Sequence, residues 1–370
     1  MELVRPITSS VSKDRTESPA TDSGARGPQA PPAWIVLGRL LSGYAVSQLI
    51  HAAVRLGLPD LLGEGPKTAE QLATATGVHA PSLFRVLRAL AAVGLVTQAD
   101  EASFRLTPVG ECLRARAPGS MRALALTTEE SYRAWGEVLY SVRTGAPAFD
   151  HVYGTGRFAY LAENSSAAAT FDEAMAGLVA RAAAAVAATY DFSGLRTLVD
   201  VGGGGGALLA AVLNSHPTLR GVLFDRPAVV RNARSIIEAA GVAGRCALEG
   251  GDFFEAVPAG GDAYILSHTL HNWDDARALR IIESCRKAMS GEGRLLVVEM
   301  VVPPQPDPSP EAYVLAMTDL QMMVMTGGRE RSEEEWRALL ASGGFNLVRL
   351  VPLGAHHYLL EAFPAEARTN

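Results

Sequence analysis

Thr197-Leu-Val-Asp-Val-Gly-Gly-Gly-Gly-Gly-Ala207 is the stretch that decides the fold of this chain. The apolar run at 197–201 predicts a buried strand, and the apolar residues over 207–215 predict a helix. The five glycines between them form a strand-to-helix turn, in which the backbone can adopt positive φ and a ligand can approach without a Cβ in the way. No Gly-Lys-Ser/Thr ends this turn, which argues against a phosphate-binding loop of the Walker A type.

Strand and helix patterns alternate from about Leu195 onward. Further strands are predicted at 221–225, 247–248, 263–266 and 294–299, with helices at 207–215, 228–240 and 274–288. The strands are short, continuous apolar runs, which are typical of a parallel sheet covered on both faces. We therefore predict an α/β fold over residues 188–364: a Rossmann-like, doubly wound, mostly parallel sheet.

Acidic residues are predicted at the carboxyl ends of three successive strands, namely Asp200, Asp225 and Asp252. In open α/β sheets this edge is where ligands bind. A carboxylate at Asp200 suits a cationic ammonium group and suits a pyrophosphate badly. Asp225 lies about 20 residues on, where it can accept from both ribose hydroxyls. Asp252 can accept from the exocyclic amine of adenine, while Phe253 offers an apolar face to the ring.

These acids and the turn residues Gly202, Gly203 and Gly204 predict binding of S-adenosylmethionine, with S-adenosylhomocysteine as product. The turn also fits the dinucleotide pattern Gly-x-Gly-x-x-Ala through Gly202, Gly204 and Ala207. An oxidoreductase that uses NAD therefore stays open as an alternative.

The region before the sheet predicts a winged helix within a domain over 33–118. Its first helix, at 33–57, carries apolar residues on more than one face and therefore has to be buried on several sides. Thr68 and Gln71 form a predicted capping box at the start of the next helix. A second helix at 81–90 and two short strands, at 95–96 and 104–106, complete the pattern. A helical region over 119–187, broken near 145–147 and 154–156, precedes the sheet.

Composition narrows the function classes. The formal net charge of −6 argues against nonspecific binding to nucleic acid or to an anionic membrane. The three cysteines, Cys112, Cys246 and Cys285, lack the close spacing of a zinc or redox site and are expected as reduced thiols. No apolar run is long enough to span a bilayer and no secretory signal is present, so the cytoplasm is the expected location. Residues 1–32 are polar and are expected to be a disordered tail, with a second short tail at 365–370.

Ser267-His-Thr-Leu-His-Asn-Trp273 follows the fourth predicted strand. With Asp225-Arg-Pro227, Gly251-Asp-Phe-Phe254 and Gly327-Gly-Arg-Glu-Arg331, it resembles the small-molecule O-methyltransferases that include plant caffeic acid and bacterial polyketide enzymes. The resemblance covers about 33–363. It implies a winged-helix dimerisation region, hence a homodimer, followed by a class I methyltransferase domain.

The resemblance also implies roles for individual residues. His271 is similar to the family's general base, and Glu299 and Glu330 are similar to the acids that flank and orient it. Ser267 and Trp273 are expected beside the cofactor, together with the residue that follows Asp225 in the landmark above, Arg226.

The chemistry of a histidine base fits these residues without any metal. A phenol has a pKa near 10 and an unperturbed imidazole one near 6.5, so at neutral pH the imidazole can accept the phenol's proton. Such help is worth on the order of 10²–10⁴-fold in rate. His268 competes for the role, although the Leu-His-x-Trp context favours His271.

The acceptor is expected to be an aromatic, phenolic or polyketide-like small molecule. Methionine tolerates irregular shapes, so the methionines around Asp319 predict an adaptable wall for it. The full set of expected acceptor-pocket residues is Trp135, Phe171, Met175, His268, Asp319, Met322 and Met323.

Three alternatives to O-methylation stay open. They are methylation of carbon or another S-adenosylmethionine-dependent reaction on the same scaffold, an NAD-type oxidoreductase, and a winged-helix regulator. The low lysine and high alanine and arginine content hints at a high-GC bacterium, in which such enzymes tailor natural products, including antibiotics.

Overall fold

The computed structural model describes residues 31–305 and 308–365, and these fall into two units, 1–43 and 44–370. Most of the tail expected at 1–32 and of the one at 365–370 therefore lies outside the described residues. Within the first unit the structure describes helix α1 (Ala33–Leu41), which has no buried residue.

The prediction of one helix over 33–57 is wrong. Helix α1 ends before Ser42, and a second helix, α2 (Gly43–Arg55), begins directly after it. The Ser42 hydroxyl donates to the carbonyl of Arg39 at 3.0 Å. A serine that bonds back to its own helix, followed by a glycine, is a common reason for a helix to break.

The winged-helix pattern is confirmed by a three-stranded antiparallel sheet of order β1-β3-β2. The Thr68–Gln71 capping box is present, and Gly77 ends its helix in the left-handed conformation. Buried leucines such as Leu72, Leu87 and Leu90 form the core of this part. Its elements are α3 (Leu58–Gly63), β1 (Lys67–Thr68), α4 (Ala69–Thr76), α5 (Ala80–Ala92), β2 (Val96–Gln98) and β3 (Ser103–Leu106).

Helices follow without a strand up to residue 189. Left-handed glycines, Gly145 and Gly154, end two of them where breaks were expected. These helices are α6 (Pro108–Glu111), α7 (Arg122–Leu126), α8 (Thr128–Gly136), α9 (Val138–Thr144), α10 (Ala148–Tyr153), α11 (Arg157–Glu163) and α12 (Ser165–Thr189).

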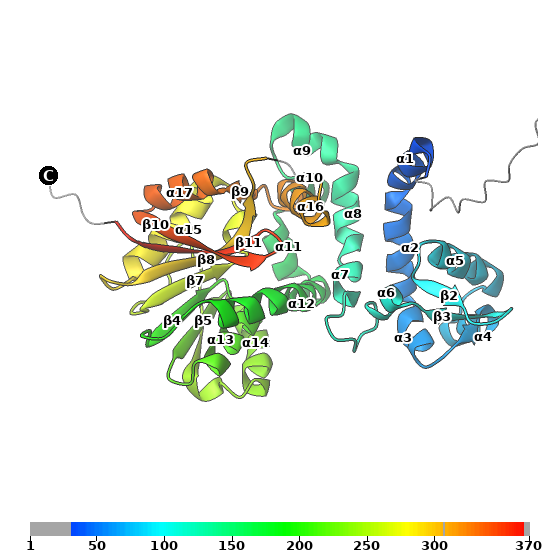
Figure 1. The fold of residues 1–370 in the computed structure, drawn as a ribbon, viewed down its shortest axis with the longest axis horizontal. Helices are drawn as coiled ribbons and strands as arrows, with labels where there is room; N and C mark the ends of the chain where they lie inside the picture. Colours follow the sequence, from blue (N-terminus) through cyan, green and yellow to red (C-terminus); the bar gives the residue numbers. More distant parts are fainter. Residues whose placement is uncertain (1–30, 306–307, 366–370) are drawn as a thin grey trace, which may run out of the picture. The chain divides into compact units, whose positions relative to one another are not determined.

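The main sheet has the strand order β10-β11-β8-β7-β4-β5-β6, with β9 paired to β8 (Figure 1). The five strands β4 to β8 are parallel, as predicted, whereas β10 and β11 form an antiparallel hairpin that the sequence analysis did not assign. The strands are β4 (Thr197–Val201), β5 (Arg220–Asp225), β6 (Cys246–Gly250), β7 (Ala263–Ser267), β8 (Arg294–Val302), β9 (Arg331–Ser332), β10 (Phe345–Gly354) and β11 (His357–Pro364).

Helices cover both faces of this sheet (Figure 1). Alternate residues of β7 enter different cores: Tyr264 and Leu266 pack with α15 and α17, whereas Ala263 and Ile265 pack with α12, α13 and α14. The remaining elements are α13 (Ala207–Ser215), α14 (Pro227–Ala239), η1 (Ala243–Arg245), η2 (Leu270–Asn272), α15 (Asp275–Ala288), α16 (Pro310–Met325) and α17 (Glu333–Ser342).

The strand order reverses at β4, which has β5 on one side and β7 on the other. Such a switch point leaves a crevice at the carboxyl ends of the strands. The glycine turn follows β4, and the His–Trp stretch follows β7, so the fold brings the two motifs to one edge.

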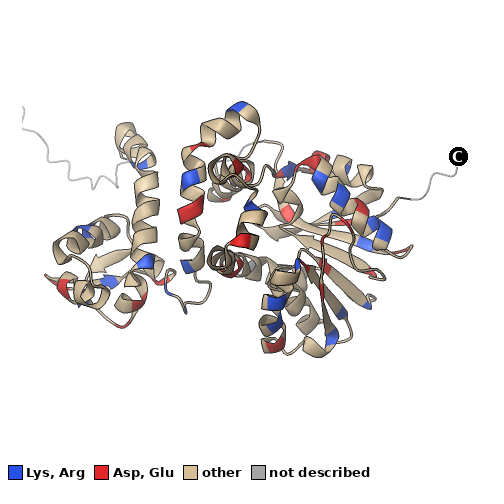
Figure 2. Cartoon of the chain, turned by 180° about the vertical axis from the view of Figure 1, so that it is seen from behind, with Lys and Arg blue, Asp and Glu red and all other residues tan. Residues whose placement is uncertain are grey.

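Basic and acidic residues are interspersed along the described helices (Figure 2). In the described part of the chain, no single helix is long and apolar enough to cross a membrane, although the bent pair α1 and α2 passes by length and composition.

Candidate active site

The glycine turn is shaped by backbone conformations and close contacts that exclude side chains. Gly202, Gly204 and Gly206 have φ values of 72°, 56° and 78°. A Cβ on Gly203 would lie 2.6 Å from the carboxylate of Asp200. The turn therefore needs glycine for two separate reasons, positive φ and lack of space.

Asp200, at the end of β4, is a buried carboxylate without a partner. Its residue is only 1% exposed, and neither carboxylate oxygen has a hydrogen-bond partner among the described residues. Burial, with a smaller contribution from Asp225, raises the pKa of Asp200 to about 7. A buried carboxylate is costly unless it is paired, so this position suits a cationic ligand group.

Asp225, at the end of β5, is fixed by the backbone. Its carboxylate accepts from the amide of Gly204 at 2.9 Å and from the amide of Arg226 at 2.7 Å. The Arg226 guanidinium donates to the carbonyl of Phe158 at 2.9 Å and lies over that ring. Hydrogen bonds thus connect the end of β5 to the glycine turn, through Asp225, and to helix α11, through Arg226.

Aromatic rings surround the predicted adenine position. The ring of Trp273 lies 5.3 Å from that of Phe158 and 6.2 Å from that of Phe253, between centroids. Asp252 is exposed, and its carboxylate accepts from the amide of Phe254 at 2.8 Å. The sequence did not predict Phe158 as a cofactor-site residue. The one feature that could have indicated it is an aromatic residue close to the glycine-rich break at 154–156.

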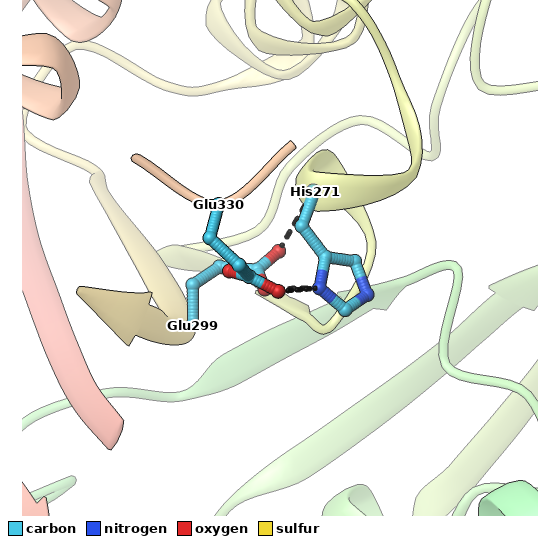
Figure 3. A group of neighbouring side chains, drawn as sticks. All are labelled: His271, Glu299 and Glu330. Carbon is cyan, nitrogen blue, oxygen red and sulfur yellow. Dashed lines mark hydrogen bonds and ion pairs between the residues drawn. The ribbon is translucent and has the colours of Figure 1, made fainter. Parts of the chain in front are cut away.

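His271 lies in the short helix η2, and two glutamates lie on the Nδ1 side of its ring (Figure 3). Its Nδ1 is 2.7 Å from a carboxylate oxygen of Glu330 and 3.5 Å from one of Glu299. The other ring nitrogen, Nε2, points away from both acids (Figure 3). A carboxylate on Nδ1 fixes the tautomer and leaves Nε2 as the nitrogen that can take a proton.

Glu299 also holds the backbone that carries the histidine. It is fully buried, and one of its oxygens accepts from the amides of Thr269, Leu270 and His271 at 3.0, 2.9 and 3.3 Å. Glu330 is held in turn, because its amide donates to Asp319 at 2.8 Å. The two acids therefore position the ring from β8 and from the loop before β9.

The glutamates dominate the electrostatics of the histidine. Burial alone lowers the pKa of His271, but the charges of Glu299 and Glu330 outweigh it and raise that pKa to about 9. Burial raises the pKa of Glu299 to about 7. Ligand atoms of the same three side chains lie within 4.8 Å of one another, close enough to hold a metal ion, so the absence of a metal stays a prediction.

Arg331 ends the motif at 327–331, but the sequence does not predict it as a site residue. It is fully buried and donates to the carbonyls of Leu270 and Trp273 at 3.3 and 2.9 Å. It also forms an ion pair with Asp275 at 2.9 Å. Arg331 thus holds the backbone of the segment that carries His271 in place. Its position directly after Glu330 in the motif is the sequence feature that could have indicated this role.

His268 has a different environment from His271. Its Nδ1 lies 3.0 Å from the hydroxyl of Ser267, and its ring centroid lies 5.8 Å from that of His271. Burial, followed by the charge of His271, lowers the pKa of His268 to about 3. Its φ of 50° is unusual for a residue other than glycine. The structure thus gives only one of the two histidines a carboxylate partner.

The predicted acceptor residues are only partly brought together. Trp135 and Met323 pack in one cluster, and the Trp135 indole donates to Gln321 at 2.6 Å. Asp319 contacts Glu330 as described, whereas Phe171 lies beneath the guanidinium of Arg157. Met175 and Met322 are half-buried.

Comparison with known proteins defines the family. The model of the O-methyltransferase domain matches residues 135–346, and that of the O-methyltransferase dimerisation domain matches residues 39–116. The chain belongs to the O-methyltransferase family.

Relatives of this methyltransferase match along most of its length. A phenazine O-methyltransferase of Lysobacter antibioticus is 44% identical, covering 89% of this chain and 96% of its own. The O-demethylpuromycin-O-methyltransferase of Streptomyces alboniger is 43% identical, covering 88% of each chain. An O-methyltransferase from neocarzinostatin biosynthesis, solved with S-adenosylmethionine and 2-hydroxy-5-methyl naphthoic acid, is 33% identical with a TM-score of 0.77, covering 86% of this chain and 96% of its own.

S-adenosylmethionine is the cofactor of this methyltransferase. The residues present fit it, because the unpartnered carboxylate of Asp200 needs a cation and the cofactor carries an ammonium group. The NAD alternative is therefore wrong, and a winged-helix regulator without enzymatic activity is wrong as well.

Proposed function

We propose that this methyltransferase methylates a hydroxyl group of an aromatic small molecule in bacterial natural-product biosynthesis, with His271 as the general base. The observation that carries the proposal is the His271 ring, which is held at Nδ1 by Glu330 and has Nε2 turned away from both glutamates (Figure 3). The relatives support the acceptor class, because their names specify phenazine, puromycin and naphthoic acid substrates or ligands.

The cofactor would be held by the three strand-end acids and the aromatic rings beside them. In this proposal Asp200 pairs with the ammonium group, and Asp225 accepts from the ribose hydroxyls. Phe253 and Trp273 flank the adenine, and Asp252 accepts from its amine. Because Gly202, Gly203 and Gly204 have no side chains, the cofactor can come close to the backbone of the turn. Ser267 and Arg226 lie beside the cofactor in this proposal. When bound, S-adenosylmethionine supplies an electrophilic methyl group.

The raised pKa of His271 suits it to a phenol. An unperturbed imidazole with a pKa near 6.5 is about 3.5 units below a phenol, so proton transfer costs about 5 kcal/mol. With the pKa raised to about 9, the gap falls to about one unit, or roughly 1.4 kcal/mol. The His271 Nε2 takes the phenol proton, and Glu299 and Glu330 stabilise the resulting imidazolium.

At pH 7, His271 already carries a proton in most molecules, because its pKa is about 9. Activity on a protonated phenol should therefore rise with pH until His271 is neutral. A substrate that binds as its phenolate would pair with the imidazolium instead and would not need the base.

The acceptor would lie against the methionines of α16 and the helices before the sheet. We assign its walls to Trp135, Phe171, Met175, Met322 and Met323. His268, neutral and next to His271, would face the acceptor, and Asp319 supports the wall through Glu330.

The protein is proposed to act as a homodimer through its N-terminal region. The dimerisation-domain model covers 39–116, and helix α1 exposes Trp34, Leu40 and Leu41 by 74%, 71% and 68%. Large apolar side chains exposed in this way on one short helix are typical of an interface.

Product analysis with an isotope-labelled cofactor tests the proposed function. The purified protein would be incubated with labelled S-adenosylmethionine and a panel of phenols, and the products examined by mass spectrometry and NMR. We expect a labelled methoxy group on an aromatic ring. A label on ring carbon or nitrogen, in place of oxygen, would show that the proposed acceptor atom is wrong.

A further inference from the structure

Arg157, the first residue of α11, is a buried cation to which the proposed reaction gives no role. Only 7% of its surface is exposed, and its Nη1 atom is buried without a hydrogen-bond partner. Among the residues that the structure describes, no acid forms an ion pair with it. Burial lowers the pKa of Arg157, although an arginine keeps its charge in proteins. A buried charge without a partner is destabilising unless something else compensates it.

Aromatic rings line the position of this cation. The guanidinium carbon lies 5.4 Å from the ring centroid of Phe149 and 5.1 Å from that of Phe171. Tyr153 and Tyr160 pack around Phe149 at 4.4 and 5.5 Å. Rings attract a cation through their faces but do not use its hydrogen-bond donors. The guanidinium thus sits in an apolar, aromatic site with donors to spare.

Glu130 is the acid that acts most strongly on Arg157, yet it does not form an ion pair with it. Its charge favours the charged form of the arginine from a distance. Burial raises the pKa of Glu130 itself, which opposes the ionisation of this acid beside the arginine. Glu130, Tyr153 and Tyr160 line a cavity of about 470 Å³, whose lining does not include Arg157 itself. The free protein therefore compensates Arg157 only in part and has space beside its neighbours.

We propose that Arg157 binds a carboxylate of the acceptor, so that the substrate is an aromatic hydroxy acid. This inference rests on the proposed function, because it specifies the substrate of the same site. A guanidinium matches a carboxylate with two parallel hydrogen bonds, and Phe171 offers a ring face beside it. The arginine would hold the acid group at one end of the substrate while the hydroxyl lies at His271.

The cofactor also carries a carboxylate, which is the competing source of the same chemistry. The charged and titratable groups that act on Arg157 come from α8, α10 and α11, namely Glu130, Tyr153 and Tyr160. Neither Asp200 nor Asp225 is among these groups. The charge of Asp225 does contribute to the raised pKa of Asp172 on α12. The contact of the guanidinium with Phe171, a proposed wall of the acceptor pocket, assigns Arg157 to the acceptor.

Binding measurements on the full-length protein can separate the two sources. Calorimetry would measure the affinity for S-adenosylhomocysteine, and then the affinity of that complex for hydroxybenzoic and hydroxynaphthoic acids and for their methyl esters. The variants are Arg157→Met, Arg157→Lys and a matched control, Arg143→Met, at an exposed arginine of α9.

We expect the wild type and Arg143→Met to prefer at least one acid over its ester by about tenfold or more. Arg157→Met should lose that preference and keep its affinity for S-adenosylhomocysteine within about threefold, whereas Arg157→Lys should keep part of the preference. Acids that bind Arg157→Met as tightly as wild type would overturn the proposal. So would a loss confined to S-adenosylhomocysteine, because the carboxylate would then be that of the cofactor.

Thermal unfolding tests whether Arg157 has only a structural role. Removing an unpaired buried charge should leave the melting temperature of free Arg157→Met equal to or above that of wild type. A marked fall that Glu130→Gln reproduces would make Arg157 a structural partner of Glu130 and would overturn the assignment. Because these tests measure binding, they are independent of the product analysis: acids can bind through Arg157 even if oxygen is not methylated, and phenols can be methylated even if acids do not bind.

Discussion

Two buried carboxylates, Asp200 on β4 and Glu299 on β8, have opposite hydrogen-bond environments. Glu299 accepts three backbone amides, whereas the oxygens of Asp200 accept nothing from the described residues. A satisfied buried acid holds structure, and an unsatisfied one is costly until a ligand arrives. At the scale of single residues, this difference separates the group that positions the base from the group proposed to bind the cofactor.

Asp200→Asn tests that separation through stability. The folded pKa of about 7 lies above the ordinary value of 3.8, so the folded state loses stability as the pH rises from about 4 to above 7. The loss reaches up to about 4 kcal/mol. We expect Asp200→Asn to unfold at a higher temperature than wild type at pH 8 without ligand, and to bind S-adenosylhomocysteine at least tenfold more weakly.

Asp252→Asn serves as the control for that experiment, because Asp252 is exposed and its carboxylate accepts from an amide. It should leave the melting temperature of the free protein close to wild type. A free Asp200→Asn protein that is less stable than wild type at pH 8 contradicts the account.

Glu330→Gln tests the source of the raised histidine pKa. Removing one carboxylate removes part of the stabilisation of the imidazolium, so the pKa of His271 should fall from about 9 toward 6.5. The midpoint of the pH–rate profile for a phenol should move to lower pH, and the plateau rate should fall because the base is weaker. Glu333→Gln, on the exposed start of α17, should change neither. An unshifted midpoint in Glu330→Gln would show that this acid does not set the pKa.

At the scale of elements, apolar periodicity was sufficient to predict β4, α13 and the alternation up to β8, because continuous apolar strands and amphipathic helices are dictated locally. It was not sufficient for the break at Ser42, where one hydroxyl and one glycine end a helix within an apolar run. The burial of Arg157 and Arg331 was also missed. A charged residue in a polar segment resembles a surface residue until tertiary packing encloses it.

Gly203→Ala tests the turn between β4 and α13. The added Cβ would lie 2.6 Å from the Asp200 carboxylate, so either the turn or the acid has to move. We expect the affinity for S-adenosylhomocysteine to fall at least tenfold in calorimetry. Gly244→Ala, where a Cβ meets nothing within 4 Å, is the matched control and should bind normally. Normal binding by Gly203→Ala would contradict the proposed role of the turn.

At the scale of the whole molecule, packing within a single chain does not explain why the apolar side chains of α1 are exposed to water. A soluble helix rarely presents Trp34, Leu40 and Leu41 to water together. The dimerisation-domain match supplies a reason, since a second copy would cover them.

Light scattering with size-exclusion chromatography tests the dimer. The wild type should have twice the chain mass of 39.0 kDa. The double variant Trp34→Glu/Leu40→Glu should shift toward one chain mass, whereas Arg39→Glu, on the same helix, should stay dimeric. A monomeric wild type, or a double variant that remains a stable dimer, would show that α1 is not the interface.

The proposed base is the central claim, and the pH dependence of kcat/KM for a phenolic acceptor tests it most directly. Wild type should gain activity with rising pH and level off near pH 9, where His271 loses its proton. His271→Ala should lose the dependence and about 10²–10⁴-fold in rate, while binding S-adenosylhomocysteine within about threefold of wild type. A His271→Ala enzyme with undiminished rate, or with the same pH profile, would contradict the account.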